Sequence, residues 1–184
     1  MRKIMLTSSG FDSKELEEVF LRLVGKAPRA MRVLFIPTAA IDPGAIEVLP
    51  KCMNDLLRVG VKPQHIRVFD LHRSLTEEEM RDYDAIYFTG GSPHYLLERI
   101  NAAGFNTVLT NWVGRGGVYV GVSAGSWVAA GNLDNNLGYL HAELAVHTKT
   151  GTASGVFNNA STQKIKLKNG SAVLIQDEQY EIIP

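Results

Sequence analysis

Short apolar runs rich in β-branched and aromatic residues alternate with amphipathic segments along residues 4–131. Each run has the length of a buried strand, and each intervening segment repeats its apolar residues at helical spacing. Parallel strands need long connections between them, which are usually helices. The alternation therefore predicts an α/β fold with a mostly parallel sheet that helices cover on both faces.

The expected strands are residues 4–7, 33–36, 66–71, 85–89 and 118–122. The expected helices start after Asp12 or Ser13, at Asp42, at Thr76, before Tyr95, at Phe105 and at Ala124. Pro50 predicts a break or a late start in the second helix, because proline lacks the N–H that an inner helical turn needs. Residues 139–148 could form a strand or a loop. Residues 164–168 and 172–176 flank Asn169-Gly170, a dipeptide typical of tight turns, which predicts a small β-hairpin near the C-terminus.

Length and charge narrow the classes of protein that remain. We expect one domain over residues 1–184, as a monomer or a homodimer. Nineteen basic residues balance nineteen acidic residues, so the charge favours neither nucleic acid nor an anionic membrane as a partner. Cys52 is the one cysteine, and no apolar run reaches the length of a membrane span. A cytoplasmic protein is the expectation.

The stretch Gly121-Val-Ser-Ala-Gly125 follows an apolar strand and opens a segment of small residues. A serine at such a strand-to-helix joint is held in strained backbone angles with its hydroxyl clear of the sheet, and the glycines leave room for the turn. We therefore expect Ser123 to be a nucleophile. The alternative is a tight turn in which Ser123 only caps the helix at Ala124.

A serine nucleophile needs a base, and the histidines after the joint are His141 and His147. Spacing alone leaves both open. Gly90-Gly91 forms a second glycine joint at a strand end, whose N–H groups could serve with that of Ala124 as an oxyanion hole. A phosphate cradle or a simple turn is the alternative there. The chain lacks the glycine patterns of nucleotide-binding loops, so we expect neither a cofactor nor a metal.

Residues 117–126, together with residues 86–97 around the Gly90-Gly91 joint, resemble the dipeptidase E and cyanophycinase family of serine peptidases. The resemblance runs from Arg2 to about Gln176 and implies a class I glutamine amidotransferase-like fold. It also implies that Ser123 is the nucleophile and that the N–H groups of Gly91 and Ala124 form the oxyanion hole. The segment 137–147 is similar to the one that carries the family's histidine, which makes His147 the base.

Three departures from the family pattern bear on activity. Val146 stands where the family usually has proline, and Asn169 stands where a glutamate commonly completes the triad. An asparagine can orient an imidazole, but it cannot stabilise the imidazolium by charge. The region after His147 is shorter, and no arginine follows Arg115, so the aspartyl specificity of the family is not expected here.

Asn169 is the first candidate for the third member of the triad, and Asp134 is the alternative. Asn169-Gly170 could also be a plain turn without a catalytic role. The functional hypothesis is a serine hydrolase that cleaves short peptides through an acyl-enzyme on Ser123. A member of the same family that only binds a small ligand or partner is the competing hypothesis. An amidase or esterase on the same residues is a third one.

Overall fold

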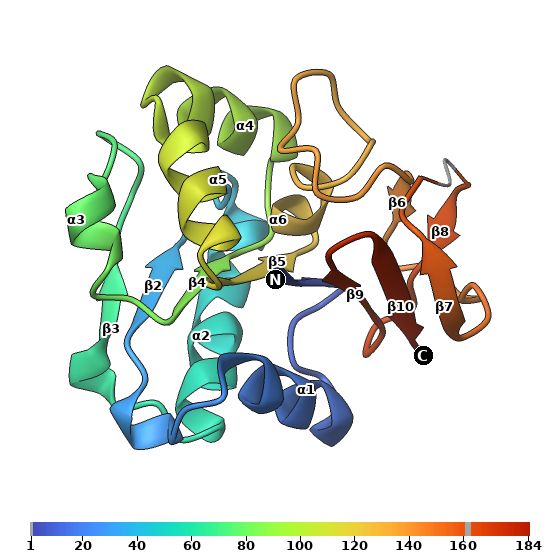
Figure 1. The fold of residues 1–184 in the computed structure, drawn as a ribbon, viewed down its shortest axis with the longest axis horizontal. Helices are drawn as coiled ribbons and strands as arrows, with labels where there is room; N and C mark the ends of the chain where they lie inside the picture. The colour runs from blue at the N-terminus through green and yellow to red at the C-terminus, as the bar shows by residue number, and fades with distance from the viewer. Residues whose placement is uncertain (1, 161–162) are drawn as a thin grey trace.

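The computed structural model describes residues 2–160 and 163–184 of the chain. Its main feature is a sheet with the strand order β3-β2-β4-β5-β1-β9-β10-β7 (Figure 1). The strands of this sheet are β1 (Lys3–Thr7), β2 (Val33–Ile36), β3 (Ile66–Val68), β4 (Ala85–Phe88), β5 (Val118–Val122), β7 (Gly155–Asn158), β9 (Ala172–Gln176) and β10 (Gln179–Ile183). The strands from β3 to β1 in this order are parallel, whereas β9, β10 and β7 extend the sheet in antiparallel fashion. The predicted, mostly parallel α/β sheet is confirmed.

Helices cover both faces of the parallel part of the sheet. They are α1 (Lys14–Val24), α2 (Pro43–Arg58), α3 (Glu77–Met80), α4 (Pro93–Ala102), α5 (Phe105–Gly114) and α6 (Ala124–Trp127). In the view of Figure 1, α1 and α2 lie below the sheet, and α4, α5 and α6 lie above it. This arrangement fits the prediction that the strands are buried on both sides.

The side chains of β4 show how one strand serves two cores. Ala85 and Tyr87 pack with the apolar faces of α1 and α2, whereas Ile86 and Phe88 point to the opposite core beside α4, α5 and α6. Successive side chains of a strand point to opposite faces, so a strand between two helical layers must be apolar throughout. All four side chains are almost completely buried.

Three expectations about helices and strands are corrected. Helix α2 runs without a break from Pro43 to Arg58, although Pro50 lies inside it. Pro50 is on the exposed side of this helix, where the loss of a single backbone hydrogen bond is tolerated. The third strand ends at Val68 rather than at residue 71. The helix after Ser123 is also short, because the chain continues from Trp127 into turns.

A β-hairpin near the C-terminus is confirmed, but β9 and β10 form it, with the turn at Asp177 and Glu178. Asn169-Gly170 is a turn between two different sheets. The strand before it, β8 (Ile165–Lys166), pairs in parallel with β6 (Leu144–Ala145) in a separate two-stranded sheet. The prediction of a hairpin at Asn169-Gly170 was therefore wrong, because β9 pairs with β1 and β10 instead of turning back on β8.

Candidate active site

Ser123 stands at the joint between β5 and α6, at the carboxyl end of the parallel strands. Its backbone has φ 48° and ψ −101°, a strained conformation for a residue with a side chain. A Cβ atom on Gly121 would lie 2.4 Å from the carbonyl oxygen of Gly125, and one on Gly125 would lie 2.7 Å from Cβ of Phe88. Both glycines are thus required by the close approach of strand and helix that holds Ser123 in place.

His147 lies between Ser123 and Asn169. Its Nε2 is 3.2 Å from Oγ of Ser123, and its Nδ1 is 2.8 Å from Oδ1 of Asn169. An amide oxygen only accepts hydrogen bonds, so Nδ1 carries the hydrogen and Nε2 is left as an acceptor for the hydroxyl of Ser123. This is the tautomer that can remove a proton from a serine.

Ser8, directly after β1, also belongs to this site, and sequence reasoning missed it. Its hydroxyl oxygen accepts a hydrogen bond from the backbone N–H of His147 at 2.8 Å. The hydroxyl donates its own hydrogen to Oδ1 of Asn169 at 3.3 Å. Two donors, Nδ1 of His147 and the Ser8 hydroxyl, therefore converge on Oδ1, which fixes the amide with its oxygen toward the imidazole. The signal was available in the sequence, because Ser8 ends a parallel strand at the same sheet edge as Ser123.

A buried carboxylate holds the loop that carries Ser8. Asp55 on α2 is completely buried, and its Oδ2 accepts hydrogen bonds from the N–H of Phe11 at 2.9 Å and from the hydroxyl of Tyr87 at 2.8 Å. Burial raises the pKa of Tyr87 well above its ordinary value, so the hydroxyl remains a donor. Next to Ser8, the hydroxyl oxygen of Ser9 accepts from the N–H of Gly170 at 3.2 Å, which ties the loop to the Asn169 turn.

Gly91 and Ala124 present their backbone N–H groups at the same sheet edge. Within residues 2–160 and 163–184, neither N–H has a hydrogen-bond acceptor. Gly91 has φ 134°, and a Cβ atom there would lie 2.0 Å from the carbonyl oxygen of Ala39, so only glycine fits. A Cβ atom on Gly90 would lie 3.4 Å from Cβ of Ser123, which places the glycine joint against the serine.

The other candidates lie elsewhere. His141 donates its backbone N–H to Oδ1 of Asn159 at 3.2 Å, and no hydrogen bond among the described residues joins its ring to Ser123. Asp134 is exposed in the loop after α6, and no hydrogen bond or ion pair among the described residues joins it to His147. The structure thus brings Asn169 to His147, and not Asp134.

A cavity of about 330 Å³ opens next to Ser123. Ser123, His147, Asn169, Gly90 and Gly91 line it on one side. The first three turns of α2 and the loop that follows β1 line it on the other. This volume is at the lower end of the range for small-molecule sites, which suits a short substrate.

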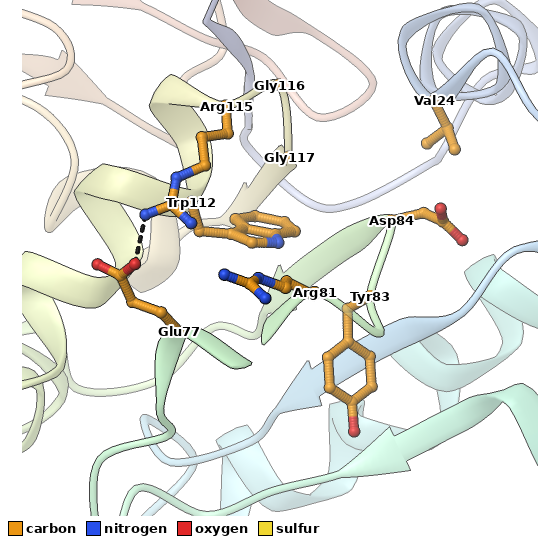
Figure 2. Close-up of a pocket in the computed structure, with 9 residues that line it drawn as sticks. All are labelled: Val24, Glu77, Arg81, Tyr83, Asp84, Trp112, Arg115, Gly116 and Gly117. Atoms are coloured by element: carbon orange, nitrogen blue, oxygen red, sulfur yellow. Dashed lines mark hydrogen bonds and ion pairs between the residues drawn. The ribbon is translucent and has the colours of Figure 1, made fainter. Parts of the chain in front are cut away.

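A second cavity, of about 280 Å³, lies at the amino ends of β4 and β5, next to Trp112 and the Arg115–Glu77 ion pair (Figure 2). Arg81 also lines it, below the indole of Trp112 in this view. Open α/β sheets place their ligands at the carboxyl ends of the strands, so this cavity is at the wrong edge to share the chemistry of Ser123.

The structure adds two observations on cofactors and membranes. Among the described residues, no group of three or more histidine, cysteine, aspartate or glutamate side chains could hold a metal ion. None of the helices in the same residues has both the length and the apolar character to cross a bilayer.

Similarity to known proteins agrees with the fold and identifies the family. The model of peptidase family S51 matches residues 4–144. An uncharacterized peptidase of Pasteurella multocida is 25% identical over 134 residues, which make up 73% of this chain and 63% of that protein. A peptidase E of Shewanella amazonensis is 29% identical over 131 residues, 70% of this chain and 54% of that protein. The chain thus spans less than two thirds of the length of these curated relatives.

A solved structure from Listeria monocytogenes, provisionally assigned as peptidase E, has the same fold. Its TM-score is 0.75 at 20% sequence identity, and the match covers 99% of this chain and 98% of that one. A peptidase from an acI-B1 Actinobacterium superposes with a TM-score of 0.65 at 18% identity. Because the family model covers most of the sequence, this chain belongs to peptidase family S51, the family of dipeptidase E.

Proposed function

We propose that this protein is a serine peptidase that hydrolyses short peptides through an acyl-enzyme on Ser123. The observation that carries the proposal is the position of His147, with one ring nitrogen 3.2 Å from Oγ of Ser123 and the other 2.8 Å from Oδ1 of Asn169. A nucleophile within hydrogen-bond reach of a base, which a third group orients in turn, is the arrangement that acyl transfer needs.

The formation and the hydrolysis of the acyl-enzyme can both be derived from this geometry. Nε2 of His147 takes the hydroxyl proton of Ser123 as Oγ attacks the peptide carbonyl, and the strained turn of a nucleophile elbow keeps Oγ exposed. The N–H groups of Gly91 and Ala124 donate hydrogen bonds to the oxyanion that forms. His147 then gives the proton to the leaving amine. A water molecule, activated by the same nitrogen, hydrolyses the acyl-enzyme and restores Ser123.

Asn169 gives this triad a neutral third member. Its oxygen holds His147 in the correct tautomer but offers no negative charge to the imidazolium that forms during attack. Ser8 completes the arrangement, because it holds the amide oxygen of Asn169 toward the ring. We therefore expect a slower peptidase than one with a glutamate at this position.

The test is covalent labelling of Ser123. Wild-type protein should react with an alkyl fluorophosphonate at one site, which peptide mass spectrometry should locate at Ser123. Ser123→Ala should keep the thermal unfolding temperature of the wild type and lose the label. The matched control is Ser126→Ala, since Ser126 is a buried serine on the same helix that bonds to the carbonyls of Thr7 and Gly121. Labelling that survives in Ser123→Ala would refute the proposal.

One observation favours a second candidate function, a ligand-binding protein without turnover. The replacement of a carboxylate by Asn169 removes charge from the triad, as expected where catalysis is no longer selected. The labelling experiment separates the two functions, because a protein that only binds ligands should leave the fluorophosphonate unreacted. An amidase or esterase would label in the same way, and a panel of peptide, amide and ester substrates distinguishes it from a peptidase.

A further inference from the structure

The cavity beside Ser123 has an apolar wall that the chemistry of the triad does not use. Helix α2 and the end of β5 supply this wall, which consists of Ala45, Val48, Leu49, Cys52 and Val122. Val48 lines this cavity, and its side chain is 48% exposed. A bound molecule could cover it, and covering apolar surface is favourable in proportion to the area removed from water.

The two charged side chains of the cavity are paired with each other. Lys51 contacts the carboxylate of Asp12 and the carbonyl oxygen of Ser9, and its Nζ is 3.8 Å from Asp55. The ammonium group thus has a hydrogen-bond acceptor in the Ser9 carbonyl and counter-charges in Asp12 and Asp55. Asp12 in turn accepts from the hydroxyl of Ser9. An acidic substrate side chain would have to compete with Asp12 for Lys51, beside a carboxylate of like charge. A basic one would have to compete with Lys51 for Asp12 in the same way.

The lysines near the triad in the sequence do not add a free positive charge to the cavity. Lys149 and Lys168 stand next to the triad in the sequence, but neither lines the cavity. Lys51, the lysine that lines the cavity, is therefore already paired with the carboxylate of Asp12.

We infer that this site selects substrates with an uncharged, apolar side chain, of about the size of leucine, and rejects acidic ones. The inference rests on the proposed function for turnover, but the binding preference can be measured without it. The apolar wall would cover the side chain. The Lys51–Asp12 pair would stay intact, because an uncharged side chain competes with neither of its charges. The volume of about 330 Å³ leaves room for a short peptide.

The experiment measures binding to the 184-residue chain that carries Ser123→Ala, which cannot consume the ligand. Two dipeptide series, X-Gly and Gly-X with leucine, aspartate or lysine as X, are titrated by calorimetry, so that each side chain position is tested. We expect the leucine peptide to bind at least about tenfold more tightly than its aspartate and lysine counterparts in one of the series. Covering one such side chain has an effect of this size.

A pair of variants locates the effect. Val48→Lys in the Ser123→Ala protein should weaken the leucine peptide about tenfold and strengthen the aspartate peptide. Ile46→Lys is the matched control, since Ile46 is 51% exposed on the same helix and does not line the cavity. It should leave both affinities unchanged.

Three outcomes would overturn the inference: aspartate or lysine peptides that bind as tightly as leucine peptides in both series, no binding in either series, or equal effects of the two lysine substitutions. The fluorophosphonate experiment reads the proposed function separately. Labelling of Ser123 together with a preference for aspartate would refute the specificity alone, and absence of labelling with a leucine preference would refute the catalysis alone.

Discussion

Ser8→Ala tests whether a single hydroxyl keeps Asn169 in its productive orientation. In the wild type, the hydroxyl donates to Oδ1 of Asn169 at 3.3 Å and accepts from the N–H of His147 at 2.8 Å. Without it, the amide can rotate and present its NH₂ group to Nδ1 of His147. That orientation favours the tautomer with hydrogen on Nε2, which cannot take a proton from Ser123.

The expected loss follows from these two bonds. A neutral hydrogen bond contributes about 0.5–1.5 kcal/mol, and the bond to Asn169 is long, so we take about 0.5–1 kcal/mol for it. The bond to His147, which supports a residue with φ 55°, contributes about 0.5–1.5 kcal/mol. Together they amount to about 1–2.5 kcal/mol, a decrease of roughly 5- to 70-fold in the rate of Ser123 phosphonylation, at about 1.36 kcal/mol for each tenfold.

Asn169→Asp separates the orientation of the amide from general loosening of the site. A carboxylate has two equivalent acceptor oxygens, so no wrong orientation exists for Ser8 to prevent. In the Asn169→Asp background, Ser8→Ala should lose only the contribution of the His147 bond. The fold-loss should therefore be smaller than in the wild type, by roughly two- to fivefold.

The assay is the second-order rate constant for fluorophosphonate labelling of Ser123 in the wild type, the two single variants and the double variant. Ser9→Ala serves as the control, because Ser9 bonds to the same turn through the N–H of Gly170 and contacts neither His147 nor the amide of Asn169. Equal fold-losses from Ser8→Ala in both backgrounds would refute the reasoning. So would a loss of the same size in Ser9→Ala.

Three further predictions concern the backbone, the triad and the buried thiol. Gly91→Ala should lower the free energy of unfolding in urea by at least about 1–3 kcal/mol, because φ is 134° and the new Cβ would lie 2.0 Å from the carbonyl oxygen of Ala39. Gly90→Ala is the control and should unfold like the wild type. Asn169→Ala should slow labelling roughly tenfold and Asn169→Glu should preserve or raise the rate; a fast alanine variant would reduce Asn169 to a turn residue. Burial raises the pKa of Cys52 above its ordinary value of 9.0, so the native thiol stays protonated at pH 8. It should react with a neutral maleimide far more slowly than the unfolded thiol, because the lower pKa of the unfolded thiol gives more thiolate. Equal rates would contradict this.

The parallel half of the fold was predictable because its physics is local to each segment. Strands such as β4 and β5 are buried on both faces, so their residues are apolar without interruption and stand out in the sequence. The glycines at positions 121 and 125 could be assigned to a close strand–helix contact for the same reason. Their requirement comes from neighbours only a few residues away in the chain or in the adjacent strand.

The C-terminal part was less predictable because its pairing is set by distant partners. Exposed and buried residues alternate along most of β10, which follows a turn at Asp177 and Glu178. This turn forms a hairpin without a strong turn signature in the sequence. Asn169-Gly170 has such a signature, but it forms no hairpin. The sheet edge that Ser8 shares with Ser123 could have marked it as a site residue, but its hydrogen bonds to Asn169 and His147 could not be predicted, because both partners lie far along the chain. The positions of His147 and Asn169 followed from the family resemblance, and spacing alone left His141 and Asp134 open.

The central place of β1 has a consequence for how the protein acquires its site during synthesis. β1 is made before every other strand of this sheet, yet its two neighbours are β5 and β9, which come more than a hundred residues later in the sequence. Contacts of such long sequence separation slow folding, because the loop between the partners must close before they are gained. Asn169 lies just before β9, so we expect it to reach His147 only when β9 has docked on β1. A nascent chain that ends before β9 therefore carries Ser123 without the complete His147–Asn169 pair, and the proposed site is completed only after the residues of β9 have been made.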